Sequence, residues 1–572
     1  MTNRRSGMLG VCAVLATIAT MPAQNAAPAR TSDAWWKHAV IYEVYPRSFA
    51  DTNGDGIGDL NGITKHLDYL AELGIDAIWI SPFYPSPQVD FGYDISDYSA
   101  IDPQYGTMAD FDRLVAEAKK RNIRIVTDLV LNHTSDRHPW FVESRSSRTN
   151  PKADWYMWRD GNANGQPPNN WQSGFGHSAW QWDPQRRQFY YHMFYKEQPD
   201  LNWDNRDLRN AIYDMVRFWL KRGVAGFRLD AITTLFEDPL LRDERILPGV
   251  NAYGDPVVGH EYTDNLPKVH EVLRELRRVT DEFPDRVVIG ETYLPNVQEL
   301  ARMYGANDDE LQLPMDTQLG FLNRLSADGF RDKLRDAESG LNGKTPLFVF
   351  DNHDNPRSWN RYGDGVHDAA IARLIATLLL APRCTALMYY GEELGMDNND
   401  PKRKEDVRDP IGITGWPKEK GRDGERTPMQ WNDGPNAGFS TAAATWLPVA
   451  PDYKERNVAR ERQNPASLLN FYKALIRLRK ENRALRDGDF VLVNEADHNV
   501  LSWLRRAGDG TAVLVALNLS ATPQTVSFDL QPQGVRGGRA STLLSSFGKP
   551  GQPVELQKVV LPAYAAWVGQ IQ

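Results

Sequence analysis

The chain has 572 residues, of which 41% are hydrophobic and 25% charged. This composition is ordinary for a soluble globular protein and excludes a disordered, collagen-like or multi-span membrane chain. A net charge of −9 gives no electrostatic basis for binding nucleic acid or an anionic membrane, so we expect a small neutral or cationic partner.

The first 29 residues have the pattern of an export signal peptide. Arg4 and Arg5 precede an apolar run from Met8 to Thr20, and a stretch of small residues with a proline follows as far as Ala29. The run is too short to span a bilayer. We therefore expect no stable membrane insertion and an exported protein, either periplasmic or extracellular.

From residue 30 onwards, short runs of β-branched and aromatic residues alternate with segments of helical periodicity. This alternation predicts an α/β fold, a (β/α)8 TIM barrel, with a first part at 30–133 and a second part at 205–486. The eight candidate strands are Val40–Phe49, Asp76–Tyr84, Ile123–His133, Gly226–Ile232, Arg286–Tyr293, Leu311–Asp316, Pro346–Asp354 and Ala386–Leu394.

Two stretches depart from the alternation. Residues 134–204 are rich in Trp, Asn, Pro and Gly, which predicts an inserted domain after the third strand. Residues 487–572 show period-2 patterns with glycine turns, which predict a C-terminal antiparallel β domain resembling a sandwich. The long polar loop Asn398–Met429 follows the eighth strand, and its length suggests a function.

Four carboxylates lie at or near the carboxyl ends of predicted strands, the end at which barrel enzymes build their sites. Because barrel strands are buried, each acid must be paired, metal-bound or catalytic. A structural ion-pair network explains Asp128 well but explains the whole set poorly, since clustered acids repel one another. The set consists of Asp128, Asp230, Glu291 and Asp354, and His133 and His353 accompany it.

Five strings in this order resemble the α-amylase family of retaining glycoside hydrolases. They are "DLVLNH" at Asp128–His133, "QPDLN" at Gln198–Asn202, "GFRLD" at Gly226–Asp230, "GET" at Gly290–Thr292 and "FDNHD" at Phe350–Asp354. "QPDLNW" and "RTPMQW" (Arg426–Trp431) resemble the α-glucosidase and oligo-1,6-glucosidase branch. The resemblance implies that Asp230 is the nucleophile, Glu291 the general acid/base and Asp354 the transition-state stabiliser.

Retaining hydrolysis needs one ionised and one protonated carboxyl group, ~5 Å apart. Arg228 lies two residues before Asp230 on the same strand, so we expect it to keep Asp230 ionised. The apolar "VVIG" before Glu291 should raise the pKa of that acid and thereby separate the two roles. His133 and His353 can hydrogen-bond sugar hydroxyls.

The resemblance further implies that Asp90 and Tyr93 of "VDFGYD" line the pocket for the terminal glucose, with Arg426 as the partner of Asp90. Such a pair would close the far end of the pocket and impose exo-action. The alternative is a β-turn with a solvated acid and a surface arginine. Phe194 is a candidate stacking wall, or else ordinary core.

We therefore expect an exo-acting retaining α-glucosidase that removes terminal α-linked glucose from maltose and short oligosaccharides. Family members that cut α-1,6 bonds typically carry Val after the nucleophile, whereas this chain has Ala231, which favours α-1,4 linkages. The alternatives are an α-glucosyl transferase that uses alcohol or sugar acceptors, an oligo-1,6-glucosidase, and a non-catalytic carbohydrate-binding or transport-accessory protein. The oligomeric state is left open.

The string "DTNGDGIGD" predicts a structural cation site. Asp51, Asn53, Asp55 and Asp59 offer oxygen ligands at alternate positions, the carbonyl group of Ile57 can add another, and Gly56 permits the sharp turn. The twelfth position is Gly62 rather than Glu, so this is not an EF-hand. Ca²⁺ fits best, with Mg²⁺ as the alternative; the competing interpretation is an Asx-rich turn without an ion.

Overall fold

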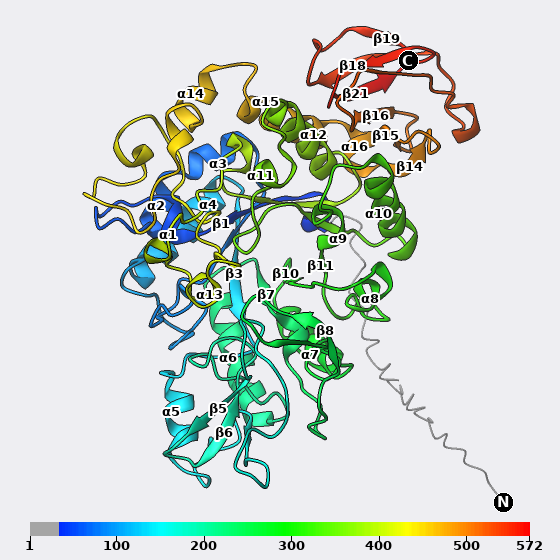
Figure 1. Cartoon of the computed structure of the whole chain (residues 1–572). Helices are drawn as coiled ribbons and strands as arrows, with labels where there is room; N and C mark the ends of the chain where they lie inside the picture. Colours follow the sequence, from blue (N-terminus) through cyan, green and yellow to red (C-terminus); the bar gives the residue numbers. More distant parts are fainter. Residues whose placement is uncertain (1–33) are drawn as a thin grey trace, which may run out of the picture. The chain divides into compact units, whose positions relative to one another are not determined.

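The computed structural model describes residues 34–572, so the predicted export signal lies outside the described residues. Eight parallel strands close into a single barrel in chain order (Figure 1), which confirms the predicted (β/α)8 fold. The barrel strands are β1 (Val40–Val44), β2 (Ala77–Ile80), β3 (Arg124–Val130), β7 (Gly226–Asp230), β10 (Val287–Gly290), β11 (Leu313–Asp316), β12 (Leu347–Val349) and β13 (Thr385–Tyr389).

Side chains alternate between the inside and the outside of the barrel, as strand geometry requires. In β1, Ile41 belongs to the cluster that fills the barrel, together with Trp79 and Val126. Its neighbours Val40 and Tyr42 belong to the larger cluster shared with the helices. The interior is therefore a packed core, and the ends of the strands are left to form a site.

Helices surround the barrel, and several begin at the caps that their sequences provide. Thr107 and Asp110 form a capping box at α4, and the side chain of Asn205 caps α6. The helices are α1 (Pro46–Phe49), α2 (Leu60–Lys65), α3 (Leu67–Leu73), α4 (Met108–Lys120), α5 (Pro139–Ser146), α6 (Arg206–Lys221), α7 (Val269–Thr280), α8 (Val297–Arg302), α9 (Thr317–Gly320), α10 (Ala327–Gly340), α11 (Ser358–Tyr362), α12 (Asp368–Leu380), α13 (Pro410–Gly415), α14 (Val458–Gln463), α15 (Leu468–Glu481) and α16 (Arg483–Asp487).

Two small antiparallel sheets interrupt the alternation. The first lies between β3 and β7 in the chain and has the order β4-β6-β5, formed by β4 (Trp158–Arg159), β5 (Trp180–Asp183) and β6 (Gln188–Tyr191). The second is a hairpin of β8 (Ile246–Val250) and β9 (Pro256–Val258) between β7 and α7, which the sequence did not predict.

The C-terminal segment is antiparallel, as predicted. It forms a six-stranded sheet in the order β14-β15-β16-β21-β18-β19 and a second pair, β17-β20. The sheet packs on the barrel helices α10 and α12 through β15 and β21. The strands are β14 (Asp489–Val493), β15 (Val500–Arg506), β16 (Ala512–Asn518), β17 (Gln524–Val526), β18 (Arg539–Ser545), β19 (Pro553–Glu555), β20 (Val559–Leu561) and β21 (Ala566–Ile571).

The observed strands are shorter than the predicted ones, so the predicted acids do not all lie at the carboxyl ends of their strands. Asp230 is the last residue of β7, and Glu291 directly follows β10. Asp354 lies five residues beyond the last residue of β12 (354 − 349), and Asp128 lies inside β3 rather than at its end. The four acids therefore lie at different positions along the chain relative to the ends of their strands.

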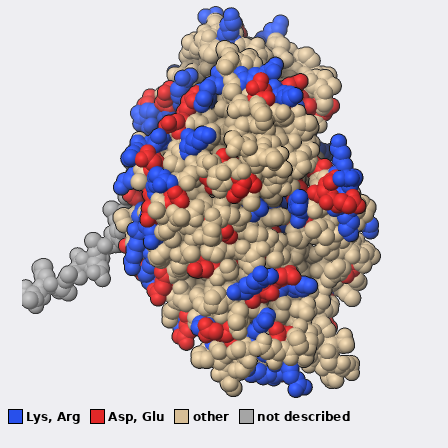
Figure 2. All heavy atoms as spheres, turned by 90° about the vertical axis from the view of Figure 1, so that its left-hand side faces the viewer, with Lys and Arg blue, Asp and Glu red and all other residues tan. Residues whose placement is uncertain are grey.

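The surface is mixed in charge. Figure 2 shows one face of the molecule, on which lysine and arginine side chains are interspersed with acidic ones. Within the described residues, no helix is both long enough and apolar enough to cross a membrane.

Candidate active site

A cavity of about 420 Å³ lies where the carboxyl ends of the barrel strands meet, a volume within the usual range for small-molecule sites, ~300–1,000 Å³. The predicted acids Asp230, Glu291 and Asp354 all line it. Five further residues expected from the sequence join them: Asp90, Tyr93, His133, Phe194 and His353.

One buried arginine connects the two acids with the central predicted roles. Arg228 Nη1 donates to Asp230 Oδ1 at 2.6 Å, and Nη2 lies 2.6 Å from Glu291 Oε1. The same guanidinium group contacts both carboxylate oxygens of Asp128 at 3.1 Å. Arg228 is 1% exposed, so three acids share one cation away from solvent.

The two acids do not have the contrasting environments that the sequence suggested. Burial raises the pKa of Asp230 to about 7 and that of Glu291 to about 7, while the charge of Arg228 opposes the shift in both cases. The expected separation is therefore wrong, because both groups are buried and both contact the same guanidinium group. The acids do differ in one contact, since Glu291 Oε2 accepts a hydrogen bond from the backbone N–H of Ala231 at 2.7 Å.

Asp354 has a different environment. Burial alone would raise its pKa, but His353, Arg422 and Arg426 together lower the pKa below its usual range. Arg422 and Arg426 each donate to Asp354 Oδ1 at 2.9 Å, and His353 Nε2 lies 3.2 Å from Oδ2. Asp354 is therefore held as an anion at the cavity wall.

His353 is fixed on three sides. Its Nδ1 lies 2.6 Å from Oε1 of the fully buried Glu43. Its ring stacks between Tyr45, with ring centroids 5.7 Å apart, and Tyr93, with centroids 5.2 Å apart. The hydroxyl group of Tyr93 donates to Asp128 at 3.1 Å, so the ring of Tyr93 rather than its hydroxyl group forms the wall of the cavity.

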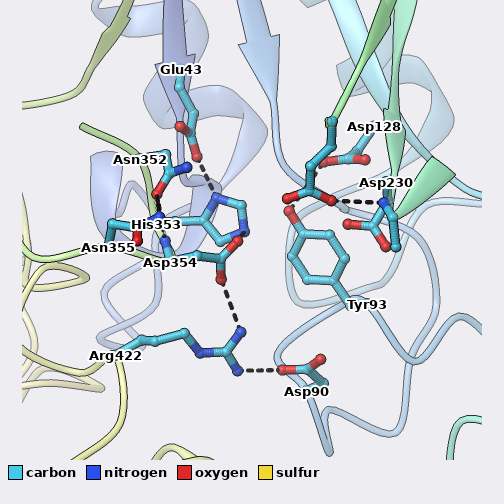
Figure 3. A network of polar contacts seen from close by, with 12 residues as sticks. Glu43, Asp90, Tyr93, Asp128, Asp230, Asn352, His353, Asp354, Asn355 and Arg422 are labelled. Carbon is cyan, nitrogen blue, oxygen red and sulfur yellow. Dashed lines mark hydrogen bonds and ion pairs between the residues drawn. The ribbon is translucent and has the colours of Figure 1, made fainter. Parts of the chain in front are cut away.

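The predicted pairing of Asp90 with Arg426 is wrong. Arg422 Nη2 donates to Asp90 Oδ1 at 2.8 Å, and Arg422 also contacts Asp409 and Asp354, as Figure 3 shows in part. Arg426 Nε instead donates to the carbonyl oxygen of His353 at 2.7 Å. Arg426 is fully buried and does not line the cavity, whereas Arg422 does.

The remaining expected residues form one wall. Gln198 Nε2 lies 3.0 Å from His133 Nε2 and donates to Asp90 Oδ2 at 3.1 Å. The rings of Phe194 and His133 meet edge to face, with centroids 5.2 Å apart. Phe194 lines the cavity and also packs against a hydrophobic cluster of the inserted segment, so its stacking on a sugar stays a prediction.

Several cavity residues were missed. Arg422 lies in the long polar loop that the sequence had marked as functional, only four residues before Arg426. Ile411 lies in the same long loop, within α13. For the others, no signal in the sequence indicated a place at the cavity: Phe175, Met193, Thr233, Thr234, His260, Asp264, Tyr293 and Asn355.

The predicted cation loop is closed by its own hydrogen bonds. Asp51 accepts the backbone N–H groups of Asn53, Gly54 and Gly56, and Asp59 caps α2 by accepting from Gly62. Over residues 34–572, no three His, Cys, Asp or Glu side chains gather as metal ligands would. The oxygen types suit Ca²⁺, but the three carboxylates are not brought together, so the cation site stays a prediction.

The comparison with known proteins agrees with this geometry. Residues 43–488 match the family described as alpha amylase, catalytic domain. A probable alpha-glucosidase of Rhizobium meliloti (strain 1021) is 47% identical over 488 residues, which cover 83% of this chain and 88% of the relative. An oligo-1,6-glucosidase of Parageobacillus thermoglucosidasius is 41% identical over 527 residues, 86% and 91% of the two chains.

Solved structures of similar sequence have the same fold. A crystal structure described as an alpha-glucosyl transfer enzyme is 40% identical, covers 94% of this chain and 100% of its own, and has a TM-score of 0.86. With the barrel, the acids and these similarities established, the chain belongs to the α-amylase family of glycoside hydrolases, in its branch of α-glucosidases and oligo-1,6-glucosidases.

Proposed function

We propose that the protein is an exo-acting retaining α-glucosidase that releases terminal α-linked glucose from maltose and short oligosaccharides. The observation that supports this most directly is the pair Asp230 and Glu291, which face one cavity and contact one guanidinium group. Double displacement needs its two carboxyl groups ~5 Å apart, whereas inversion needs room for a water molecule between them. A guanidinium group shared by both acids favours the closer arrangement.

In the first step, Asp230 attacks the anomeric carbon while Glu291 donates its proton to the glycosidic oxygen, and the bond to the leaving sugar breaks. In the second step, Glu291 takes a proton from water, which attacks the anomeric carbon and releases Asp230. The anion of Asp354 stabilises the positive charge that develops on the sugar ring. Product glucose keeps the α configuration.

Exo-action follows if one end of the cavity is closed. Arg422 connects Asp90 to Asp354 through two ion pairs of 2.8 and 2.9 Å, and Gln198 ties Asp90 to His133. A layer of this kind offers several partners to the hydroxyl groups of a terminal glucose and leaves no path for a longer chain.

The preference for α-1,4 bonds rests on Ala231, which lines the cavity directly after the nucleophile. A methyl-sized difference at such a position changes specificity by roughly 10- to 200-fold at most. The oligo-1,6-glucosidase alternative therefore needs a direct comparison of substrates.

The test is an assay of the purified protein on maltose, isomaltose, sucrose and starch, with the anomer of the first glucose released identified by NMR. We expect maltose to be the best of the four substrates and the α anomer to appear first. Asp230→Asn is the matched control because it preserves size; activity that survives this change, or β-glucose as the first product, would contradict the proposal.

A second candidate is glucosyl transfer, which the similarity to an alpha-glucosyl transfer enzyme favours. Transfer uses the same first step, after which a sugar or alcohol hydroxyl group replaces water. Product analysis with an added acceptor distinguishes the two activities.

We also propose that residues 1–29 direct export and that Asp51, Asn53, Asp55, Asp59 and the carbonyl group of Ile57 hold a structural Ca²⁺. The first proposal rests on the signal-like sequence. The second rests only on the choice of oxygen ligands, since the three carboxylates are not gathered in the described residues. Neither has a part in the chemical steps above.

A further inference from the structure

One carboxylate in the cavity lacks the partners that the others have. Five carboxylates line the cavity, and Asp90, Asp230, Glu291 and Asp354 each contact an arginine. Asp264 is the fifth, and its Oδ1 is buried without a hydrogen-bond partner. Within residues 34–572, Asp264 also forms no ion pair. A buried acceptor without a donor destabilises the protein unless a ligand supplies the donor.

The backbone around Asp264 is held firmly. Asp264 lies between the β8–β9 hairpin and α7, and the two oxygens of Glu244 accept the N–H groups of Tyr262 and Glu261 at 2.7 and 3.0 Å. The next residue, Asn265, donates its N–H to the carbonyl oxygen of Thr233 at 2.8 Å. The position of Asp264 is thus set by its neighbours in the chain, while no described group donates a hydrogen bond to its Oδ1.

This anchoring also fixes the side of the cavity to which Asp264 belongs. Thr233 lies three residues after Asp230 and lines the cavity. Ala231, between them, donates its N–H to Glu291, the group that protonates the leaving oxygen in the proposed mechanism. The Asp90–Arg422–Asp354 layer comes from other loops (Figure 3). Asp264 therefore belongs to the side on which the leaving sugar departs.

We propose that Asp264 binds hydroxyl groups of the sugar that leaves in the first step, and of the sugar that attacks when transfer replaces hydrolysis. This inference rests on the proposed function. A carboxylate accepts strong hydrogen bonds from neighbouring sugar hydroxyl groups, and a site built to bind a hydroxyl group discriminates strongly against a group that lacks it. Asp264 is a binding residue in this scheme and takes no part in bond cleavage.

The experiment compares two substrates that share glucose but differ in the leaving group. The leaving group of maltose is a sugar with several hydroxyl groups, whereas the leaving group of p-nitrophenyl α-glucoside is an aromatic ring that lacks these hydroxyl groups. For Asp264→Ala we expect kcat/KM on maltose to fall roughly 10- to 150-fold, the effect of losing one hydrogen bond to a charged group. On the nitrophenyl substrate we expect a change within about twofold, because the glucose side of the cavity is untouched.

Asp264→Asn, which keeps the shape and one acceptor oxygen, should lose less on maltose than Asp264→Ala. Glu261→Ala is the matched control, since Glu261 lies on the same segment but is exposed and pairs with Arg245; it should leave both substrates unchanged.

The outcomes separate the two proposals. If the wild type hydrolyses neither substrate, the proposed function fails before Asp264 is considered. If the wild type is active and Asp264→Ala loses the same factor on both substrates, or on neither, the inference about Asp264 is overturned. A selective loss on maltose, accompanied by a lower ratio of transfer to hydrolysis when maltose is in excess, supports it.

Discussion

Replacing Arg422 with lysine tests whether the charge network at the glucose end of the cavity works as a unit. The guanidinium group of Arg422 contacts three acids at once: Nε lies 2.8 Å from Asp409, Nη1 2.9 Å from Asp354 and Nη2 2.8 Å from Asp90. A lysine ammonium is a single point and cannot reproduce this fork. If it stays near Asp409 and Asp354, Asp90 keeps only Gln198, at 3.1 Å.

The size of the effect can be worked out from that lost contact. Burial already raises the pKa of Asp90 to about 6, and the charge of Arg422 opposes the shift. With lysine in place of Arg422, the positive charge lies farther from Asp90, so the pKa of Asp90 rises further. One hydrogen bond between charged groups contributes about 1.5–3 kcal/mol, so kcat/KM on maltose should fall roughly 10- to 150-fold.

The assay is steady-state kinetics of Arg422→Lys, Asp90→Asn and the double variant. Since both single changes disrupt the same contact, between Arg422 and Asp90, kcat/KM of the double variant should fall no further than that of the worse single variant. Arg403→Lys is the matched control, because Arg403 lies in the same loop, is 70% exposed and pairs with Asp406 at the surface. Unchanged kinetics of Arg422→Lys, or fully additive losses in the double variant, would refute this account of the network.

Three further predictions concern the acid/base, a buried acid and the cation loop. Glu291→Gln should lower kcat/KM on maltose about 10²- to 10⁴-fold but lower it much less on p-nitrophenyl α-glucoside, whose leaving group needs no proton, while kcat falls on both because the second step loses its base; equal losses of kcat/KM would rule out the proton-donor role. Burial raises the pKa of Glu425 to about 8, against the opposing charge of Arg426. The protonated side chain therefore contributes fully to the free energy of unfolding below about pH 4.3, the pKa in the unfolded chain, and this contribution is lost as the pH rises through 8. Urea unfolding between about pH 5 and 9 should therefore show a smaller loss of stability for Glu425→Gln than for the wild type, and parallel curves would contradict this. Chelation by EDTA should lower the melting temperature, Ca²⁺ should restore it, and Asp55→Ala should abolish the response; a melting temperature indifferent to both reagents in the wild type would mean that the loop holds no exchangeable ion.

The barrel could be predicted because its physical cause is visible in the sequence. Strands such as β7 and β10 are buried on both faces and therefore appear as apolar runs. A charged residue stands out in such a run, so Arg228, Asp230 and Glu291 were identified from their surroundings alone. The resemblance to a family then assigned roles that burial by itself could not distinguish.

Contacts between loops could not be predicted in the same way. Arg422 and Arg426 both belong to the polar loop after β13, and nothing in their spacing indicates which one reaches Asp90. The pKa contrast between Asp230 and Glu291 failed for a related reason. It was argued from neighbours in the sequence, whereas the shared contact with Arg228 exists only once β7 and β10 lie side by side.

The similar surroundings of Asp230 and Glu291 suit the proposed chemistry better than a sharp contrast would. Glu291 must donate a proton in the first step and accept one in the second, and a group does both most effectively when its pKa lies near the working pH. Burial raises the pKa of both acids and the charge of Arg228 opposes the shift, so the pair favours holding one proton, with one carboxylate ionised beside Arg228. When Glu291 holds that proton, Arg228 and the ionised Asp128 remain to orient Asp230. When Asp230 is bonded to the sugar it carries no charge, and Glu291 is free to ionise and activate water. Because Arg228 contacts both acids, the negative charge can pass from one carboxyl group to the other while the buried residues around them keep their positions.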